Sequence, residues 1–514
     1  MTDPRSAFTP VFNSVAIPQH QVAALEMDSF HAGVLEGVEK GWRVVSYFGR
    51  ALPGPAGVEL VAVLADDFNG ELRAARTRVQ GDTFPSLTPR CPQVHLFERE
   101  IAEQMGLRPE GHPWLKPVRF ARALRAGHDA WGRDPAAVPP IGVMDFYRVD
   151  GEAVHEVAVG PVHAGVIEPG HFRFQCHGEE VFHLEISLGY QYRGIEEHLI
   201  GGPDKLTLKQ METVAGDSSI AHSTAYCQAL EGLSGATASA RAHVIRAVAL
   251  ELERLANHTG DLGALAGDIG FQPTLSFCGR IRGDFLNLSA LLCGSRFGRG
   301  LVRPGGVRFD LSPAQADDLL RGLDVARREV TAAVEPLWTT PSVLARFEYI
   351  GPVTPEQCLD LGLVGPPARA CGLERDARTQ HPAGVFQFTT IPLVTAHHGD
   401  VNSRAFVRWL EIQRSLDYLD ERLRHLPTAG RAVPAAAPAA LAPDSLVVSL
   451  VEGWRGEVCH VALTDGQGRF ARYKITDPSF HNWMGLALAL RGQQISDFPL
   501  CNKSFNLSYC GFDL

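Results

Sequence analysis

A turn of small residues that leads directly into a helix is the feature that most constrains this chain. Residues 214–219 read Val-Ala-Gly-Asp-Ser-Ser, and a helical pattern begins near Ala221. Glycine and other small residues let a ligand approach the backbone closely, and the amide N–H groups and the positive end of the helix would then face that ligand. Such turns are also ordinary helix starts, so the turn alone does not define a site.

Long amphipathic helices are predicted in the middle of the chain. Residues 242–257 carry apolar side chains at helical spacing, and a second apolar stripe runs through residues 409–423. Ser312-Pro313-Ala314-Gln315 has the form of a capping box with proline at the first helical position. These patterns predict the core of a helical bundle.

The first 130 residues have a different pattern. Residues 30–40 can form a short helix, and residues 43–48 and 58–64 are rich in the β-branched and aromatic residues typical of strands. We interpret Glu98-Arg99-Glu100 as a solvated helix face with local ion pairs. A proline-rich stretch at 134–142 then indicates a linker. The resulting division is a domain of residues 1–130, a linker of residues 131–145 and a domain of residues 146–514.

Composition excludes several classes of function. The chain has 514 residues, 45% of them hydrophobic and 21% charged, which suits a globular protein of two or three domains. A net charge of −10 without a basic stretch argues against a nucleic-acid partner. Because no run of 18 apolar residues occurs, we expect neither a transmembrane helix nor a signal peptide. The ten cysteines form no C-x-x-C pair, which argues against a paired zinc or iron–sulfur motif and for reduced, buried thiols.

The spelling of the central turn resembles the nickel-site motif of nickel–iron hydrogenase large subunits, Arg-x-Cys-Gly-x-Cys-x-x-x-His. Gly216 falls on the glycine of that motif and His222 on the histidine. The two cysteine places hold Ala215 and Ser218 instead. The closest resemblance is to the membrane-bound, energy-converting group of these enzymes.

The C-terminal segment resembles the second half of the same site. Residues 477–500 contain a Pro-Ser-Phe segment followed by Asp-x-Pro-Leu, as in the family. By ungapped count the two later cysteine places fall on Ser508 and Gly511, and Cys510 is displaced by one position. Nickel in such a site needs soft thiolate ligands. The resemblance therefore implies a large subunit in which all four nickel-ligand places are vacant.

The rest of the chain resembles two subunits of respiratory complex I. Residues 84–113, with a Phe-Pro-Ser segment and a Gly-His-Pro turn, are similar to its 30-kDa-type subunit, and the later residues to its 49-kDa-type subunit. Fusion of the two is typical of formate-hydrogenlyase-type large subunits. The resemblance implies an α+β fold, with a small α/β N-terminal domain followed by a mainly α-helical bundle of the hydrogenase large-subunit type with peripheral β-strands.

The resemblance also suggests residues that would contact a quinone. In complex I a histidine on a glycine-rich loop reaches the quinone headgroup; His171 is the nearest match here and His163 the second. An imidazole can donate a hydrogen bond and a proton to a quinone carbonyl, although a histidine in a turn can equally be a solvated polar residue. The place of the usual quinone-binding tyrosine falls near Gly216. Glu168 resembles a glutamate that helps to hold magnesium in hydrogenases, but one carboxylate does not define a metal site.

A further candidate pair lies in a segment that resembles the family's Arg-x-Ser-Gly…Asp-x-Arg. Asp376 and Arg378 could pair beside the former active-site cavity or form a buried structural ion pair. We therefore take as candidate catalytic residues His171, His163 and His222, and as candidate quinone-cavity residues Gly216, Asp217, Ser218, Asp376 and Arg378, with no metal ligand.

Three functional hypotheses follow from the resemblance. In the first, the chain is a subunit of an NADH-quinone oxidoreductase-like complex and passes electrons from a partner iron–sulfur small subunit to a quinone or similar acceptor. In the second, it is a non-catalytic subunit that transmits conformational change to an ion-pumping membrane arm. The third, an active nickel–iron hydrogenase, is rejected because Cys510 alone cannot replace four thiolates. The complex would lie on the cytoplasmic side, peripheral on the inner face of the cell membrane.

Cofactors are expected mainly on partner subunits. No strand–GxGxxG–helix fingerprint for a nicotinamide cofactor occurs, so NADH would be oxidised, and iron–sulfur clusters held, by other subunits. This chain is expected to bind no cofactor firmly, with a quinone as its candidate ligand. We expect the small subunit to contact residues 215–222 and 497–514. The apolar residues of the tail would lie either at that interface or in the chain's own core: Phe498, Leu500, Phe505, Leu507 and Phe512.

Overall fold

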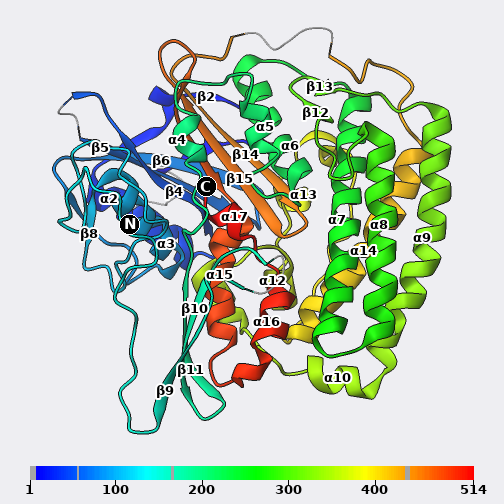
Figure 1. Ribbon diagram of the computed structural model, residues 1–514. Coiled ribbons are helices and arrows are strands. Elements are labelled where there is room, and N and C mark those ends of the chain that lie inside the picture. Colours follow the sequence, from blue (N-terminus) through cyan, green and yellow to red (C-terminus); the bar gives the residue numbers. More distant parts are fainter. Residues whose placement is uncertain (1–6, 55–56, 164–166, 435–439) are drawn as a thin grey trace.

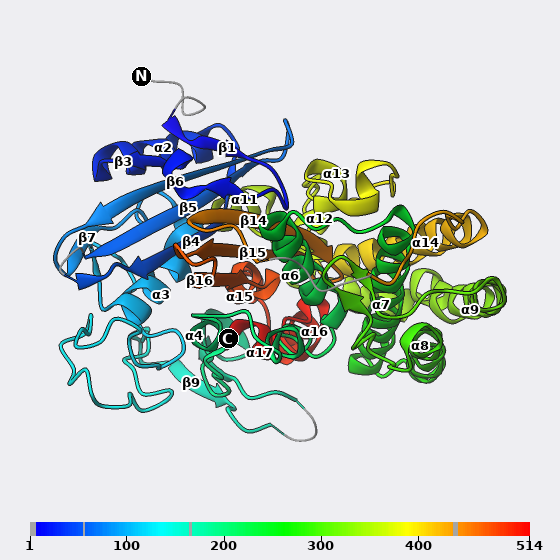
Figure 2. The same cartoon turned by 90° about the horizontal axis from the view of Figure 1, so that it is seen from above.

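The computed structural model describes residues 7–54, 57–163, 167–434 and 440–514. An N-terminal α/β domain lies at one side of the molecule and a bundle of long helices at the other (Figure 1). Seen from above, the strands β14, β15 and β16 lie between the two (Figure 2). The α+β fold class predicted from the sequence is therefore confirmed.

The N-terminal domain is built on one sheet. Its strands follow the order β1-β6-β5-β4, all antiparallel, and β3 lies parallel to β6. Residues of β4 and β5 are almost all buried because both faces of this sheet are covered. The elements are β1 (Thr9–Val11), β3 (Ala23–Leu25), α2 (Met27–Glu39), β4 (Arg43–Ala51), β5 (Val58–Asp66), β6 (Glu71–Val79), β7 (Thr83–Pro85), α3 (His95–Met105) and β8 (Arg108–Glu110).

Helix α3 differs from its prediction, because its charged residues are buried. Glu98 accepts hydrogen bonds from the Leu87 amide (2.7 Å) and the Thr88 hydroxyl (2.6 Å). Glu100 is paired with Lys474 of the C-terminal part at 2.7 Å. The interpretation of Glu98-Arg99-Glu100 as a solvated face was therefore wrong: α3 lies between the two parts of the chain, and its carboxylates are satisfied by distant segments.

The second sheet joins the two ends of the sequence. Its antiparallel order is β16-β15-β14-β2, from β2 (Ile17–Pro18), β14 (Ser445–Gly453), β15 (Gly456–Thr464) and β16 (Phe470–Thr476). The N-terminal segment continues along β14, because the Ser14 amide donates to Val448 O (2.7 Å) and the Leu450 amide to the Asn13 side chain (2.8 Å). Side chains from this sheet and from the N-terminal sheet share one hydrophobic cluster.

Four long helices form the bundle: α7 (Ala240–Asp268), α8 (Gln272–Cys293), α9 (Pro313–Thr339) and α14 (Val401–Arg424). They lie side by side in Figure 1. Both predicted apolar stripes are buried, in α7 and α14. Helix α9 begins at the predicted capping box, where the Ser312 hydroxyl accepts a hydrogen bond from the Gln315 amide.

The remaining elements include a small three-stranded sheet and a set of shorter helices. Strands β9 (Val154–Val159), β10 (His171–His177) and β11 (Glu180–Ser187) form a three-stranded antiparallel sheet. Within the described part of the chain, no helix is both long and apolar enough to span a membrane. The helices are α4 (Ile195–His198), α5 (Thr207–Met211), α6 (Ser219–Ser234), α10 (Pro341–Phe347), α11 (Pro355–Leu361), α12 (Gly365–Ala370), α13 (Ala377–Gln380), α15 (Pro478–Ala489), α16 (Phe498–Phe505) and α17 (Tyr509–Phe512).

Candidate functional site

The start of α6 is capped by a carboxylate from the helical bundle. Glu253 of α7 accepts hydrogen bonds from the amides of Ile220 (2.7 Å) and Ala221 (3.3 Å). These first-turn amides are therefore already occupied, and they do not face a ligand as the sequence suggested. Burial raises the pKa of the Glu253 carboxyl to about 8, although the two amide hydrogen bonds oppose that rise.

Two arginines fasten the central turn to the C-terminal tail. The Arg455 guanidinium pairs with both carboxylate oxygens of Asp217 and donates through Nε to the carbonyl of Asn506 at 2.6 Å. Arg193 donates to the carbonyls of Thr213 (2.6 Å) and Cys510 (2.8 Å). Planar, multidentate guanidinium contacts of this kind fix orientation as well as distance. We call the resulting contact between residues 213–218 and residues 506–511 the junction.

Cys510 lies at the centre of the junction. Its sulfur lies 3.4 Å from the Ser508 hydroxyl, and the Glu168 carboxylate and the Gly216 amide lie near enough to shift its pKa. Burial, followed by the negative charge of Glu168, raises the pKa of the Cys510 thiol to about 11. Cys510 is therefore a protonated thiol. Because Glu168 lies beside Cys510, the loop that carries Glu168 adjoins the junction as a third segment.

The four positions that the sequence resemblance aligns with nickel ligands meet here, but their side chains do not fit a nickel–iron group. Ala215 and Gly511 carry no donor atom, and the Ser508 hydroxyl already accepts the Gly511 amide at 2.9 Å. A Cβ atom at Gly511 would lie 2.6 Å from Cγ of Asp477, so that carboxylate occupies the space of a fourth ligand. Among the described residues, no group of three or more His, Cys, Asp or Glu side chains could hold a metal ion.

His222 is buried behind the turn. Its Nε2 lies 3.1 Å from a carboxylate oxygen of Asp477, and its Nδ1 lies 3.1 Å from Nε2 of His460. Asp477 also caps α15 by accepting the Ser479 amide. The structure thus connects His222 to the tail through Asp477, although the imidazole itself is enclosed by α6, β15 and the start of α15.

The two other candidate histidines lie on the loop and strand that follow β9. His171 is held by the carbonyl of Gly160 (3.1 Å) at one ring nitrogen and by Arg173 Nε (3.3 Å) at the other. Because side chains alternate along a strand, its ring lies on the face opposite Phe172, which packs against Tyr509. These contacts disagree with the expectation that the His171 imidazole reaches a quinone beside Gly216.

His163 lies closer to the β10 backbone than to the junction. Its Nε2 is 2.9 Å from the carbonyl of Gly170, and its ring centroid is 6.0 Å from that of Phe172. Among the described residues of this loop, Glu168 lies beside Cys510 of the junction, and its carboxylate accepts a hydrogen bond from the Gln191 side chain at 3.1 Å.

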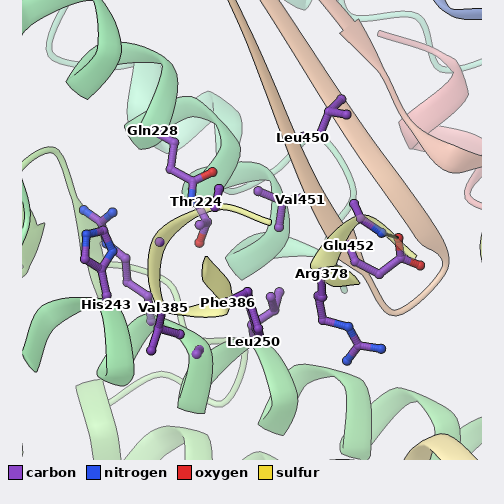
Figure 3. Close-up of a pocket in the computed structure, with 15 residues that line it drawn as sticks. Thr224, Gln228, His243, Leu250, Arg378, Val385, Phe386, Leu450, Val451 and Glu452 are labelled. Atoms are coloured by element: carbon purple, nitrogen blue, oxygen red, sulfur yellow. Dashed lines mark hydrogen bonds between the residues drawn. The ribbon is translucent and has the colours of Figure 1, made fainter. Parts of the chain in front are cut away.

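Asp376 and Arg378 form the predicted pair, within a large buried charge network. Arg378 binds both oxygens of Asp376 (3.0 and 2.6 Å) and donates to Glu251 of α7 at 3.0 Å. Arg378 and Glu452 lie on one side of a small cavity, with His243 on the other side (Figure 3). Burial, followed by the charge of Asp376, raises the pKa of Glu452 to about 7. Asp376 and Arg378 therefore form a buried structural ion pair, which is the second of the two alternatives that the sequence left open.

The apolar residues of the tail belong to the core of the chain. Between 1% and 9% of each side chain is exposed. The interface alternative is therefore wrong for these five residues, and the own-core alternative is confirmed: Phe498, Leu500, Phe505, Leu507 and Phe512.

Several residues that build the junction were not identified from the sequence. Neither Arg193 nor Arg455 was singled out, and Glu253 was not distinguished from its neighbours within residues 242–257. His460 lies in β15, which is otherwise rich in apolar residues, and Tyr473 lies in the buried strand β16. A buried polar residue in a strand needs a hydrogen-bonding partner. This requirement was the signal by which the sequence could have pointed to His460 and Tyr473.

Comparison with known proteins identifies two family models. Residues 44–130 match the 30 Kd subunit of respiratory-chain NADH dehydrogenase, and residues 268–445 and 435–513 match its 49 Kd subunit. The chain is 31% identical over 439 residues to formate hydrogenlyase subunit 5 of Escherichia coli, covering 83% of this chain and 76% of that one. It is 31% identical to the carbon monoxide-induced hydrogenase of Rhodospirillum rubrum, covering 69% of this chain and 98% of the relative.

A complex I subunit is also similar. NADH-quinone oxidoreductase subunit 4 of Thermus thermophilus is 28% identical over 363 residues, which cover 66% of this chain and 89% of the relative. The order of the matches along the sequence agrees with the arrangement of an N-terminal α/β domain before the central sheet and helical bundle. The chain therefore belongs to the family of complex I 49-kDa-type subunits and hydrogenase large subunits, in the form that carries a fused 30-kDa-type domain.

Proposed function

We propose that this chain is the large subunit of a membrane-associated, complex I-like oxidoreductase without a nickel–iron centre. It receives electrons from a partner iron–sulfur small subunit and passes them toward a quinone or a similar acceptor. The observation that carries the proposal is the junction itself. Arg193 and Arg455 hold the turn and the tail together as a complete, ordered structure, yet the side chains at the former ligand places are Ala215, Ser218, Ser508 and Gly511.

The residues that would meet an acceptor are those on the open side of the junction. Gly216 and Asp217 are partly exposed, and Glu168 and Cys510 lie beside them. Glu168 would take the role expected of His171, because its carboxylate lies beside Cys510, whereas the His171 imidazole is held by Gly160 and Arg173. The protonated Cys510 thiol there can donate a hydrogen bond to a quinone carbonyl.

The partner would bind around this opening rather than on the tail. The tail's apolar side chains are enclosed in the core, whereas Val162, Ile167 and Phe297 are 89%, 58% and 41% exposed. Ile167 precedes Glu168, and Phe297 lies beside Arg299, which donates to the Gly216 carbonyl at 3.4 Å. We infer that these residues contact the iron–sulfur small subunit, and that membrane-arm subunits place the assembly on the inner face of the cell membrane.

Purification of the complex with its small subunit tests this function directly. The partner's clusters are reduced chemically, a short-chain quinone is added, and cluster reoxidation is followed by electron paramagnetic resonance. We expect reoxidation to slow in Glu168→Gln and to remain unchanged in Glu179→Gln, a control on an exposed hairpin. Equal rates in both variants and the wild type would remove the junction as the acceptor site.

A second function, that of a non-catalytic coupling subunit, is favoured by one observation. Both ring nitrogens of His171 are held by Gly160 and Arg173, so the family's quinone-facing histidine is turned away. If the chain is a coupling subunit, the iron–sulfur clusters of the partner would stay reduced after quinone is added, while the complex remained intact. NADH, in either case, would be oxidised on another subunit.

A further inference from the structure

A line of four buried side chains crosses the molecule behind the junction. Tyr473 Oη lies 2.8 Å from His460 Nδ1, His460 Nε2 lies 3.1 Å from His222 Nδ1, and His222 Nε2 lies 3.1 Å from Asp477 Oδ2. None of the four residues is more than 1% exposed. The line joins β16, β15, α6 and the start of α15, so its members come from four separate elements.

The donors and acceptors along this line can be assigned from its two ends. Burial raises the pKa of Tyr473 well above its usual range, so the phenol keeps its proton and donates it to His460 Nδ1. Burial raises the pKa of Asp477, but hydrogen bonds from His222 and Ser479 and the charge of Arg455 lower it further, so this carboxylate accepts. His460 then donates from Nε2 to His222 Nδ1, and His222 donates from Nε2 to Asp477. All three donors therefore point the same way.

We propose that these four side chains form a proton relay between the protein surface and the junction. A proton taken up by the Tyr473 oxygen, as its own proton passes to His460, displaces each following proton by one bond. His460 passes its Nε2 proton to His222, and His222 passes its Nε2 proton to Asp477. The line then holds one additional proton, carried on the Asp477 carboxyl, and every member of the reversed line still has a hydrogen-bonding partner.

Each end of the relay lies where a proton would enter or leave. At one end, the ring of Tyr226 is 6.3 Å from that of Tyr473, and Tyr226 lines a surface cavity of about 530 Å³ together with Lys209 and Leu441. At the other end, the Gly511 backbone lies directly against the Asp477 carboxylate. The line thus runs from Tyr473, which packs beside a tyrosine of this cavity, to the junction, and neither His163 nor His171 belongs to it.

The charged groups around the relay are themselves paired. Glu196 faces His460, and its charge is offset by Lys474 (3.0 Å) and Arg472 (2.8 Å). Arg455 faces Asp477 but is bound to Asp217. Two thiols face Tyr473, and both stay protonated because burial raises their pKa: Cys227 and Cys459. No neighbouring charge among the described residues is therefore left to hold the relayed proton in place of Asp477.

This inference deepens the proposed function, because reduction of a quinone to a quinol takes up two electrons and two protons. The electrons would come from the partner's clusters, and the relay would supply protons at the junction. An experiment on the isolated full-length chain separates the two proposals, since it requires neither partner nor quinone.

The test is the exchange of the His222 imidazole proton with water. The chain is labelled with 15N-histidine, the His222 and His460 signals are assigned with His222→Gln and His460→Gln, and exchange is followed by nuclear magnetic resonance. We expect both rings to carry their proton on Nε2. We also expect Tyr473→Phe, which keeps the ring but removes the hydroxyl, to slow exchange by at least about 100-fold, the lower end of the effects of a positioned proton donor.

The matched control is Tyr418→Phe, because Tyr418 is another buried tyrosine, bound to Thr389 at 3.2 Å and outside the relay. Exchange in that variant should equal that of the wild type. The relay would be refuted if His460 carried its proton on Nδ1, or if exchange were equal in the wild type and Tyr473→Phe. The four side chains would then form a structural network only. Fast exchange in a chain whose complex leaves quinone unreduced would keep the relay and overturn the proposed function instead.

Discussion

Replacement of Lys474 by methionine should destabilise the chain more than almost any other substitution of a single charged residue. The ammonium is fully buried between Glu100 at 2.7 Å and Glu196 at 3.0 Å. The cluster around it is balanced in the wild type, with three carboxylates and three cations. Its members are Glu100, Glu103, Glu196, Arg119, Arg472 and Lys474.

The magnitude follows from the charge that the substitution leaves behind. Methionine fills a similar volume, but both carboxylates lose a buried partner and the cluster keeps one uncompensated negative charge, which costs about 3–5 kcal/mol when no water replaces the ammonium. The double variant Lys474→Met/Glu100→Gln removes that stranded charge, so it should recover part of the loss. Lys209→Met, at an exposed position of α5, should change stability by no more than about 0.5 kcal/mol.

Urea unfolding followed by tryptophan fluorescence measures the effect, and its pH dependence checks the cause. Burial raises the pKa of Glu196, but Lys474, Arg472 and Arg119 lower it further, well below its usual value. The stability that Glu196 contributes is therefore present above its unfolded pKa and is lost as the pH falls through its folded pKa. In the variant this pKa rises, so the destabilisation should shrink toward acid pH. A loss below about 1 kcal/mol at neutral pH would refute the assignment of an unrelieved buried charge.

Three further predictions concern the junction. Because the folded pKa of Glu253 is raised to about 8, its contribution to stability is complete below its unfolded pKa and is lost as the pH rises toward 8; urea titrations of Glu253→Gln should lack this slope. Gly511→Ala places a Cβ 2.6 Å from Asp477 Cγ and should lower the free energy of unfolding by about 1–3 kcal/mol, whereas Gly279→Ala, where a Cβ meets open space, should not lower it. Elemental analysis of the chain after growth with nickel should find much less than one nickel per chain, since its four ligand places lack thiolates.

The sequence predicted the fold class and the long helices well because those depend on local periodicity. The apolar stripes in residues 242–257 and 409–423 face the bundle core, and the Ser312 capping box begins α9 as expected. Helix α3 was misinterpreted for the opposite reason. Its carboxylate Glu100 is neutralised by Lys474, which is 374 positions away in the sequence, and no local pattern records such a partner.

The candidate site was predicted in part. Motif spelling located the turn and the tail, which the structure places in contact, but it could not show which way a side chain points. His171 and Phe172 are neighbours on β10, and their alternation places the phenyl ring rather than the imidazole toward the tail. His460 and Tyr473 gain their meaning only when β15 and β16 are paired beside α6, which is information about tertiary structure.

The run of residues 13–19 along the edge of β14 has a consequence for how the two domains can be separated. An open strand edge presents unpaired amides and carbonyls and invites association with other chains. Here the first domain supplies the missing strand, through Ser14, Ile17 and Pro18, to the sheet of the second. A cut within residues 131–145 would therefore yield two fragments that remain bound by strand donation, whereas the second fragment produced alone would carry an uncovered edge. The fusion of the two domains in one polypeptide guarantees that each copy of the sheet receives its own closing strand.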